Sequence, residues 1–119
     1  VVDIAATLAF YTGVLGMEHQ VFHPGDGTTR HALRFGAQKI NLHDVAAPFA
    51  PYAAHPAPGS ADLCFLSDHP LTGWLVHFEA LGIAVEQGPV ARTGATGGIM
   101  SVYIRDPDGN LIEISNRVV

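Results

Sequence analysis

The sequence predicts an α+β fold made of two similar βαβββ modules, each a small sheet with one helix on its outer face. The order of the expected elements repeats along the chain: a helix and three strands, then a strand, a helix and three strands. The helix ends repeat too, because Leu15-Gly16-Met17 resembles Leu81-Gly82-Ile83, 66 positions later (82 minus 16). An internal repeat of this length indicates modules that bury their apolar surface together. We expect a single domain over residues 1–119, with a curved, half-open mixed sheet.

The first module covers about residues 1–58. Asp3 is a good N-cap, and apolar residues follow at helical spacing until Gly16, a residue type that commonly ends helices. Strands are expected at 18–23, 29–35 and 38–43, before a loop rich in proline and alanine. A shift of 66 positions places the partner of the strand at 60–66 ahead of Val1. We therefore expect the first strand of this module to be missing from the chain.

The second module covers about residues 59–119. After its first strand, Asp68 is expected as the N-cap of a helix and Pro70 as an early helical proline, and Gly82 predicts the end of that helix. An apolar stripe at helical spacing lies between them. Further strands are expected at 84–87, 99–105 and 110–115. A glycine-rich loop at 93–98 and an Asp-Pro-Asp-Gly turn at 106–109 separate them.

Composition excludes several classes of function. Only 6 of the 119 residues are Lys or Arg and the net charge is −5, so no basic patch for nucleic acid or an anionic membrane is visible. No apolar run reaches the roughly 20 residues that a membrane helix needs. The single cysteine, Cys64, excludes an internal disulfide and fits the reducing cytoplasm.

The segment Ser101-Val102-Tyr103-Ile104-Arg105-Asp106-Pro107-Asp108-Gly109-Asn110-Leu111-Ile112-Glu113 resembles the closing hairpin of vicinal-oxygen-chelate proteins. That superfamily includes glyoxalase I, the bleomycin- and fosfomycin-resistance proteins and dihydroxybiphenyl dioxygenase. Phe10 to Met17 resembles the end of the family's first helix. Segments 38–43 and 58–65 resemble one branch especially, the poorly characterised glyoxalase-domain-containing proteins. The resemblance covers essentially the whole chain.

The resemblance implies a divalent metal held by the first and last strands of the modules. Glu113 stands where the family has a metal ligand, although a solvated edge glutamate is the alternative. Asp62 stands where many relatives have histidine, so the metal stays open between Zn, Ni, Mn, Mg and Fe. The alternative for Asp62 is an aspartate that binds a backbone amide. The matching residue of the first module falls ahead of Val1.

Other candidates lie near this expected pocket. Asn41 stands where glyoxalase I has a glutamate, and His43 shares its face and could coordinate or move a proton, unless it caps the following loop. Tyr103 stands where phosphonate-binding relatives have tyrosine, and its hydroxyl could donate to an oxyanion. Arg105 could pair with a carboxylate or phosphate of the substrate, or simply lie at the surface.

Two functions follow from these residues. The first is a metal-dependent lyase or isomerase of the glyoxalase type, in which His43, Tyr103 and Glu113 are catalytic, Asp62 and Glu113 bind metal, and Asn41, Tyr103 and Arg105 bind substrate. Ring-cleaving dioxygenase chemistry is disfavoured by Asp62. The second is a metal-free binding protein of the bleomycin-sequestering type. The resemblance also implies a homodimer.

Overall fold

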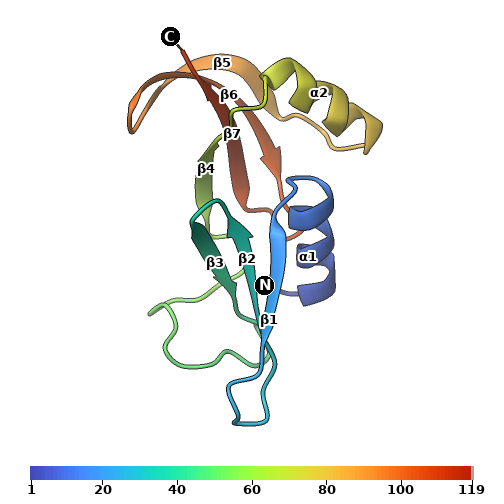
Figure 1. Cartoon of the computed structure of the whole chain (residues 1–119), viewed down its shortest axis with the longest axis vertical. Coiled ribbons are helices and arrows are strands. Elements are labelled where there is room, and N and C mark those ends of the chain that lie inside the picture. The colour runs from blue at the N-terminus through green and yellow to red at the C-terminus, as the bar shows by residue number, and fades with distance from the viewer. Residues whose placement is uncertain (119) are drawn as a thin grey trace. The chain divides into compact units, whose positions relative to one another are not determined.

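The computed structural model describes residues 1–118, in two compact units that meet in sequence between Gly59 and Ser60. The first unit contains α1 (Ile4–Gly13), β1 (Glu18–Phe22), β2 (Arg30–Phe35) and β3 (Gln38–Leu42) (Figure 1). The second contains β4 (Asp62–Leu66), α2 (Leu71–Ala80), β5 (Gln87–Gly94), β6 (Gly97–Arg105) and β7 (Leu111–Arg117). The predicted α+β class is confirmed, with a mixed sheet in the second unit. No helix among the described residues is long and apolar enough to cross a membrane.

Helix α1 begins where the sequence predicts. The Asp3 carboxylate accepts a hydrogen bond from the Ala6 amide at 3.0 Å, which satisfies one of the free amides of the first turn. The buried face of the helix packs against β1 and β2. The chain leaves the helix through Gly16 at a φ of +71°, a conformation that glycine adopts without strain. This reversal delivers the chain into β1.

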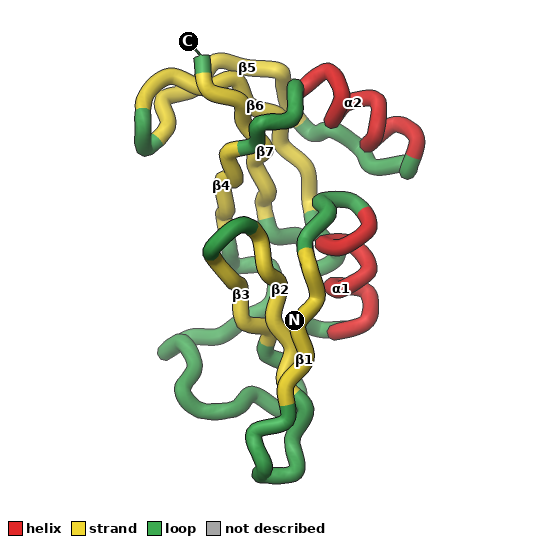
Figure 2. The backbone as a smooth tube through the Cα atoms, in the orientation of Figure 1, coloured by secondary structure: helices red, strands yellow, loops and turns green. Residues whose placement is uncertain are grey.

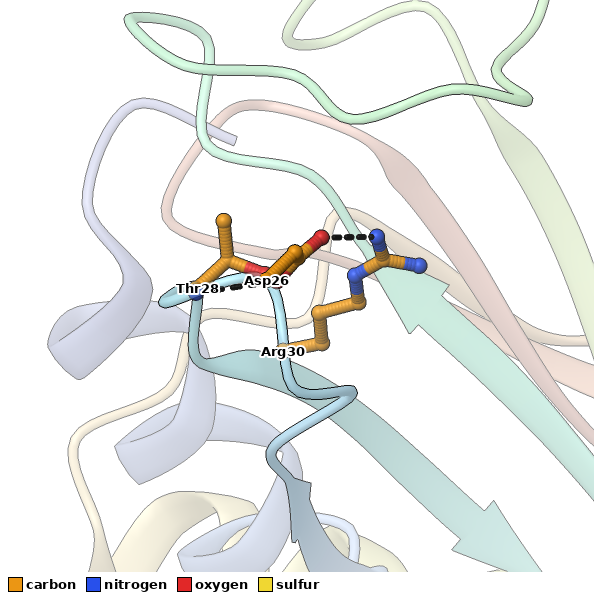
Figure 3. A network of polar contacts seen from close by, with 3 residues as sticks. All are labelled: Asp26, Thr28 and Arg30. Atoms are coloured by element: carbon orange, nitrogen blue, oxygen red, sulfur yellow. Dashed lines mark hydrogen bonds and ion pairs between the residues drawn. The ribbon is translucent and has the colours of Figure 1, made fainter.

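The first sheet has the order β1-β2-β3, with both pairs antiparallel. Between β1 and β2, the Asp26 carboxylate accepts hydrogen bonds from the hydroxyl and the amide of Thr28 and pairs with Arg30 at 3.0 Å (Figure 3). These hydrogen bonds, the Thr28 hydroxyl first, hold the pKa of Asp26 below its ordinary value. The turn is therefore closed by a local network. A long loop follows β3 and leads to β4 (Figure 2).

The second sheet has the order β4-β7-β6-β5, in which β4 runs parallel to β7 and the other pairs are antiparallel. One face of β6 and β7 carries an apolar row that meets α2. Its buried members are Val102, Ile104, Ile112 and Ile114 on the strands and Leu71 and Phe78 on the helix. This row is the core of the unit. Since side chains alternate along strands, the other face of the same strands remains for polar residues.

The start of α2 differs from the prediction. Asp68 is not the N-cap; that position is Pro70, which offers no side-chain hydrogen bond. The first amide of the helix, at Leu71, instead donates to the side chain of Asn116 on β7 at 2.7 Å. The Asn116 amide group donates back to the carbonyls of Ser67 and His69. Asn116, 45 positions after Leu71, therefore caps the helix in place of Asp68.

The repeat inferred from sequence extends to individual hydrogen bonds. Gly16 and Gly82 share nearly the same positive φ, +71° and +70°. The backbone nitrogen of Val1, an ammonium group here, donates to the carbonyl of His43, just as the amide of Ser67 donates to the carbonyl of Ser115. Val1 and Ser67 are again 66 positions apart. His43 and Ser115, 72 positions apart, therefore correspond as the acceptors of these hydrogen bonds, and two residues earlier Asn41 corresponds to Glu113.

One hairpin is longer than predicted. Strand β5 runs from Gln87 to Gly94, whereas the expected strand was 84–87 and residues 93–98 were expected to form a loop. The ladder continues to the pairs Thr93↔Gly98 and Gly94↔Gly97, so only a two-residue turn separates β5 from β6. Glycine-rich sequence weakens strand propensity, but backbone pairing with β6 outweighs it here.

Candidate functional site

The polar face of the second sheet gathers the predicted site residues of that unit. Cys64 is the register partner of Glu113, and Asp62 lies two residues before Cys64 on β4. Tyr103 is the partner of Glu113 on the opposite side, from β6. Paired residues project from the same face of a sheet, so Asp62, Glu113 and Tyr103 share one surface. The pairing of β7 with both β4 and β6, together with the alternation of side chains along each strand, brings the three residues to this surface.

Glu113 is half-buried and held by two serine hydroxyls. Ser101 donates to its Oε2 at 2.5 Å, and the Ser115 hydroxyl lies 3.4 Å from the same oxygen. The two serine oxygens are 2.7 Å apart, and both residues are fully buried. Because both serines converge on Oε2, the carboxylate orientation is restricted and Oε1 is left for other partners. The sequence reading missed these serines; their alternation with Tyr103 and Glu113 on the strands was the available signal.

Cys64 lies beside the same carboxylate. Its Sγ is 3.6 Å from the Ser115 hydroxyl oxygen. Burial is the main cause that raises the pKa of the thiol; the Glu113 and Asp62 carboxylates raise it further, and the hydrogen bond with Ser115 opposes them. The thiol is therefore neutral near pH 7, as a small structural residue would be.

The pair Asp62 and Glu113 could supply two of the ligands of a metal ion. Carboxylate oxygens suit a hard or borderline divalent ion, and Asp62 is exposed and able to reorient. Over residues 1–118, however, no three His, Cys, Asp or Glu side chains come together in a way that could hold a metal ion. The residues fit a metal as two of its ligands, and the remainder would have to come from elsewhere.

Tyr103 has a partner that the sequence reading did not assign. Arg92, expected in a loop, lies on β5, and its Nε donates to the Tyr103 hydroxyl at 3.1 Å. The guanidinium carbon lies 5.7 Å from the centre of the Tyr103 ring. Arg105 is engaged differently, in an exposed ion pair with Glu86 at 3.0 Å and a hydrogen bond to the carbonyl of Gly109. Arg92, and not Arg105, is therefore joined to Tyr103.

Asn41 and His43 lie in the first unit. Asn41 is exposed on β3, and His43 follows the strand with its ring stacked on Phe49 at 4.1 Å. Arg30 covers Phe49 from a centroid distance of 4.1 Å. The His43 Nδ1 is buried and has no hydrogen-bond partner among the described residues. The role of His43 beside Tyr103 and Glu113 stays a prediction, as do the substrate roles of Asn41 and Arg105.

His19 and His23, whose spacing resembles a metal motif, are both exposed near one edge of the first sheet. His19 Nε2 lies 2.9 Å from His31 Nδ1, and the two rings stack. Burial is the main cause that lowers the pKa of His31, and the neighbouring histidines add to it. The contact of His19 is thus with another imidazole, and His23 contacts the Thr29 hydroxyl.

Comparison with known proteins identifies the class. Residues 1–114 match the family model described as the Glyoxalase/Bleomycin resistance protein/Dioxygenase superfamily. The chain belongs to this superfamily, as the closing hairpin indicated.

Several relatives are similar over nearly the whole chain. Virulence protein STM3117 of Salmonella typhimurium is 53% identical over 98% of this chain and 78% of its own length. Its crystal structure superposes with a TM-score of 0.92, covering 99% of this chain and 90% of that one. The glyoxalase domain-containing protein RDO1 of Mycosarcoma maydis is 49% identical over 96% of this chain, which spans only 62% of RDO1. A lactoylglutathione lyase from Agrobacterium tumefaciens is 34% identical with a TM-score of 0.70, over 98% of this chain and 86% of that one.

Proposed function

We propose that this protein is a glyoxalase-like, metal-dependent enzyme that binds a small substrate through adjacent oxygens and catalyses a lyase or isomerase reaction. The observation that supports it most is the Glu113 carboxylate, oriented by Ser101 and Ser115 on the face it shares with Asp62 and Tyr103. A half-buried carboxylate loses part of its hydration, and a bound cation would offset that cost beyond what the two serine hydroxyls do. The similarity to a lactoylglutathione lyase supports the same class of chemistry.

Each side chain has a role in this proposal. Glu113 and Asp62 would hold a divalent ion, with Glu113 presenting Oε1. When bound, such an ion supplies Lewis-acid stabilisation of negative charge on substrate oxygen. The Tyr103 hydroxyl accepts from Arg92, so its own proton is free to donate to a substrate oxygen. Proton transfer by His43, a residue of the first unit, remains part of this proposal.

Metal content tests the proposal directly. The full-length protein, purified without chelator, is expected to retain close to one divalent ion per chain, and Glu113→Gln with Asp62→Asn is expected to abolish this. Glu79→Gln, which removes an exposed carboxylate from α2, is the control and should leave the metal content unchanged. A wild-type content below about 0.2 ions per chain would contradict the proposal, because a complete site retains its ion.

The second candidate is a metal-free small-molecule binding protein. Asn41 favours it, because the first unit has a neutral amide in the place that matches Glu113. In that case the Glu113 side chain would serve as a hydrogen-bond acceptor for the ligand. Ligand binding that is unchanged in Glu113→Gln and in the presence of EDTA would favour this candidate over the enzyme.

A further inference from the structure

We infer that Arg92, held in place by Tyr103, is the residue that recognises an anionic head group, a carboxylate or a phosphate, on the small molecule that this protein takes. The inference deepens the proposed function and rests on the same face of the second sheet. It adds Arg92, a residue outside the strands expected from the sequence, to the oxyanion contact expected of Tyr103.

The position of the guanidinium is the first argument. The register partner of Arg92 on β6 is Ile99, and Tyr103 lies four residues further along that strand. The Arg92 side chain is exposed, and it extends along the sheet face far enough to reach the Tyr103 hydroxyl. Its Nε bond to the Tyr103 hydroxyl brings the positive charge to the row of residues that contains Glu113, the cross-strand partner of Tyr103.

The pairing of the charge is the second argument. Arg30, Arg34 and Arg105 each form an ion pair with a carboxylate of the same unit. Arg92 instead contacts a neutral phenol and the carbonyl of Ala91, and no carboxylate among residues 1–118 pairs with it. A guanidinium has five N–H donors, and these two hydrogen bonds leave three. The remaining donors are suited to the oxygens of a carboxylate or phosphate.

The hydroxyl of Tyr103 completes the arrangement. Because its oxygen accepts from Arg92, its hydrogen is available for a second acceptor close to the guanidinium. An oxyanion at this place would accept from Arg92 and Tyr103 together. Glu113 carries the opposite charge, so an anion is attracted to the Arg92 side and repelled from the Glu113 side. A ligand with an anionic head would therefore be oriented along the row.

Anion binding to the metal-free protein tests this inference. The EDTA-treated full-length protein is titrated separately with inorganic phosphate and with lactate, a small hydroxycarboxylate, while the backbone amide resonance of Glu113, the cross-strand partner of Tyr103, is followed by NMR in the wild type and in every variant. We expect a saturable shift of that resonance with at least one probe. The responsive probe identifies the head group as phosphate or carboxylate.

Substitutions at Arg92 and Tyr103 test whether these two side chains bind the anion. Arg92→Gln is expected to weaken binding about tenfold or more, the effect of losing a charge-assisted hydrogen bond. Arg92→Lys keeps the charge without the planar fork and should recover only part of the affinity. Tyr103→Phe should weaken binding by less than Arg92→Gln. Arg34→Gln removes the same charge from the first unit and should change nothing.

The outcomes separate this inference from the proposed function. Unchanged affinity in Arg92→Gln, or no saturable shift with either probe, would overturn the inference even if the protein retains its metal. Anion binding that depends on Arg92 in a protein that never retains metal would support the inference and contradict the metal-dependent enzyme.

Discussion

Ser101 and Ser115 show how two small residues can control a carboxylate. Both hydroxyls are fully buried, lie 2.7 Å apart and approach the same oxygen of Glu113. A buried hydroxyl must satisfy its own hydrogen-bonding capacity, and here the neighbouring serine and the charged acceptor do so. The result is a polar cluster inside the sheet, adjacent to the apolar core on the opposite face.

Removal of one of these hydroxyls tests the cluster. Ser101→Ala should lower the free energy of unfolding by about 1.5–3 kcal/mol, the range for a hydrogen bond to a charged group. Urea denaturation at pH 7 measures the change. Thr72→Ala, at an exposed position of α2, is the control and should shift stability by no more than about 0.5 kcal/mol. Equal changes in unfolding free energy for the two substitutions would show that the hydrogen bond from Ser101 to Glu113 does not stabilise the fold.

The Asp26 network at the turn before β2 predicts a dependence on pH. Its folded-state pKa lies below the ordinary value of 3.8, so its contribution to stability is present above pH 3.8 and is lost as pH falls through the folded pKa. Carboxyl titration by NMR should give a midpoint below 3.8 for wild type. In Thr28→Val the midpoint should rise toward 3.8, since the largest cause of the shift is removed. Thr29→Val should leave it unchanged, and a shift there instead would contradict the assignment.

At the scale of elements, α2 depends on β7 as well as on its own sequence. Asn116 accepts from the first helical amide and donates to two carbonyls of the segment that precedes the helix. It thereby joins the end of β4, the start of α2 and the end of β7. Local sequence offered Asp68 as the cap, but a side chain already held on β7 takes that role.

Substitution at Asn116 should expose this dependence. Asn116→Ala leaves the Leu71 amide and two carbonyls without their partner, so we expect a loss of about 2–3 kcal/mol in unfolding free energy. Asn116→Asp keeps the acceptor for Leu71 and should lose less. Asp68→Ala should have little effect because Asp68 is not the cap. A larger loss of stability in Asp68→Ala than in Asn116→Ala would show that Asp68, and not Asn116, caps α2.

At the scale of the whole molecule, the two units repeat one pattern of chain direction, glycine reversal and terminal hydrogen bonding. They differ in the residues on corresponding strands: Glu113 and Ser115 in one, Asn41 and His43 in the other. Corresponding strands of the two units therefore carry different side chains. Among the described residues, the Glu113 carboxylate bound by Ser101 and Ser115 belongs to the second unit.

The expected homodimer is a prediction at this scale. Strands β1, β3, β4 and β5 lie at the ends of their own sheets, and an edge strand with free backbone groups favours pairing or covering. Sedimentation equilibrium should give a mass near twice the 12.6 kDa of this chain. A single species at the mass of one chain over micromolar concentrations would contradict the dimer.

The sequence by itself determined the α+β class and the repeat, and its resemblance to the superfamily implied that Asp62, Tyr103 and Glu113 belong to one site. The class and the repeat follow from local periodicity, from glycines at helix ends and from the alternation of strand residues. Only the tertiary structure decided that Asn116 caps α2, that Ser101 and Ser115 orient Glu113, and that Arg92 reaches Tyr103. Each of these contacts joins residues on different strands or elements. Strand pairing brings such residues together, and no local pattern in the chain encodes which side chains then meet.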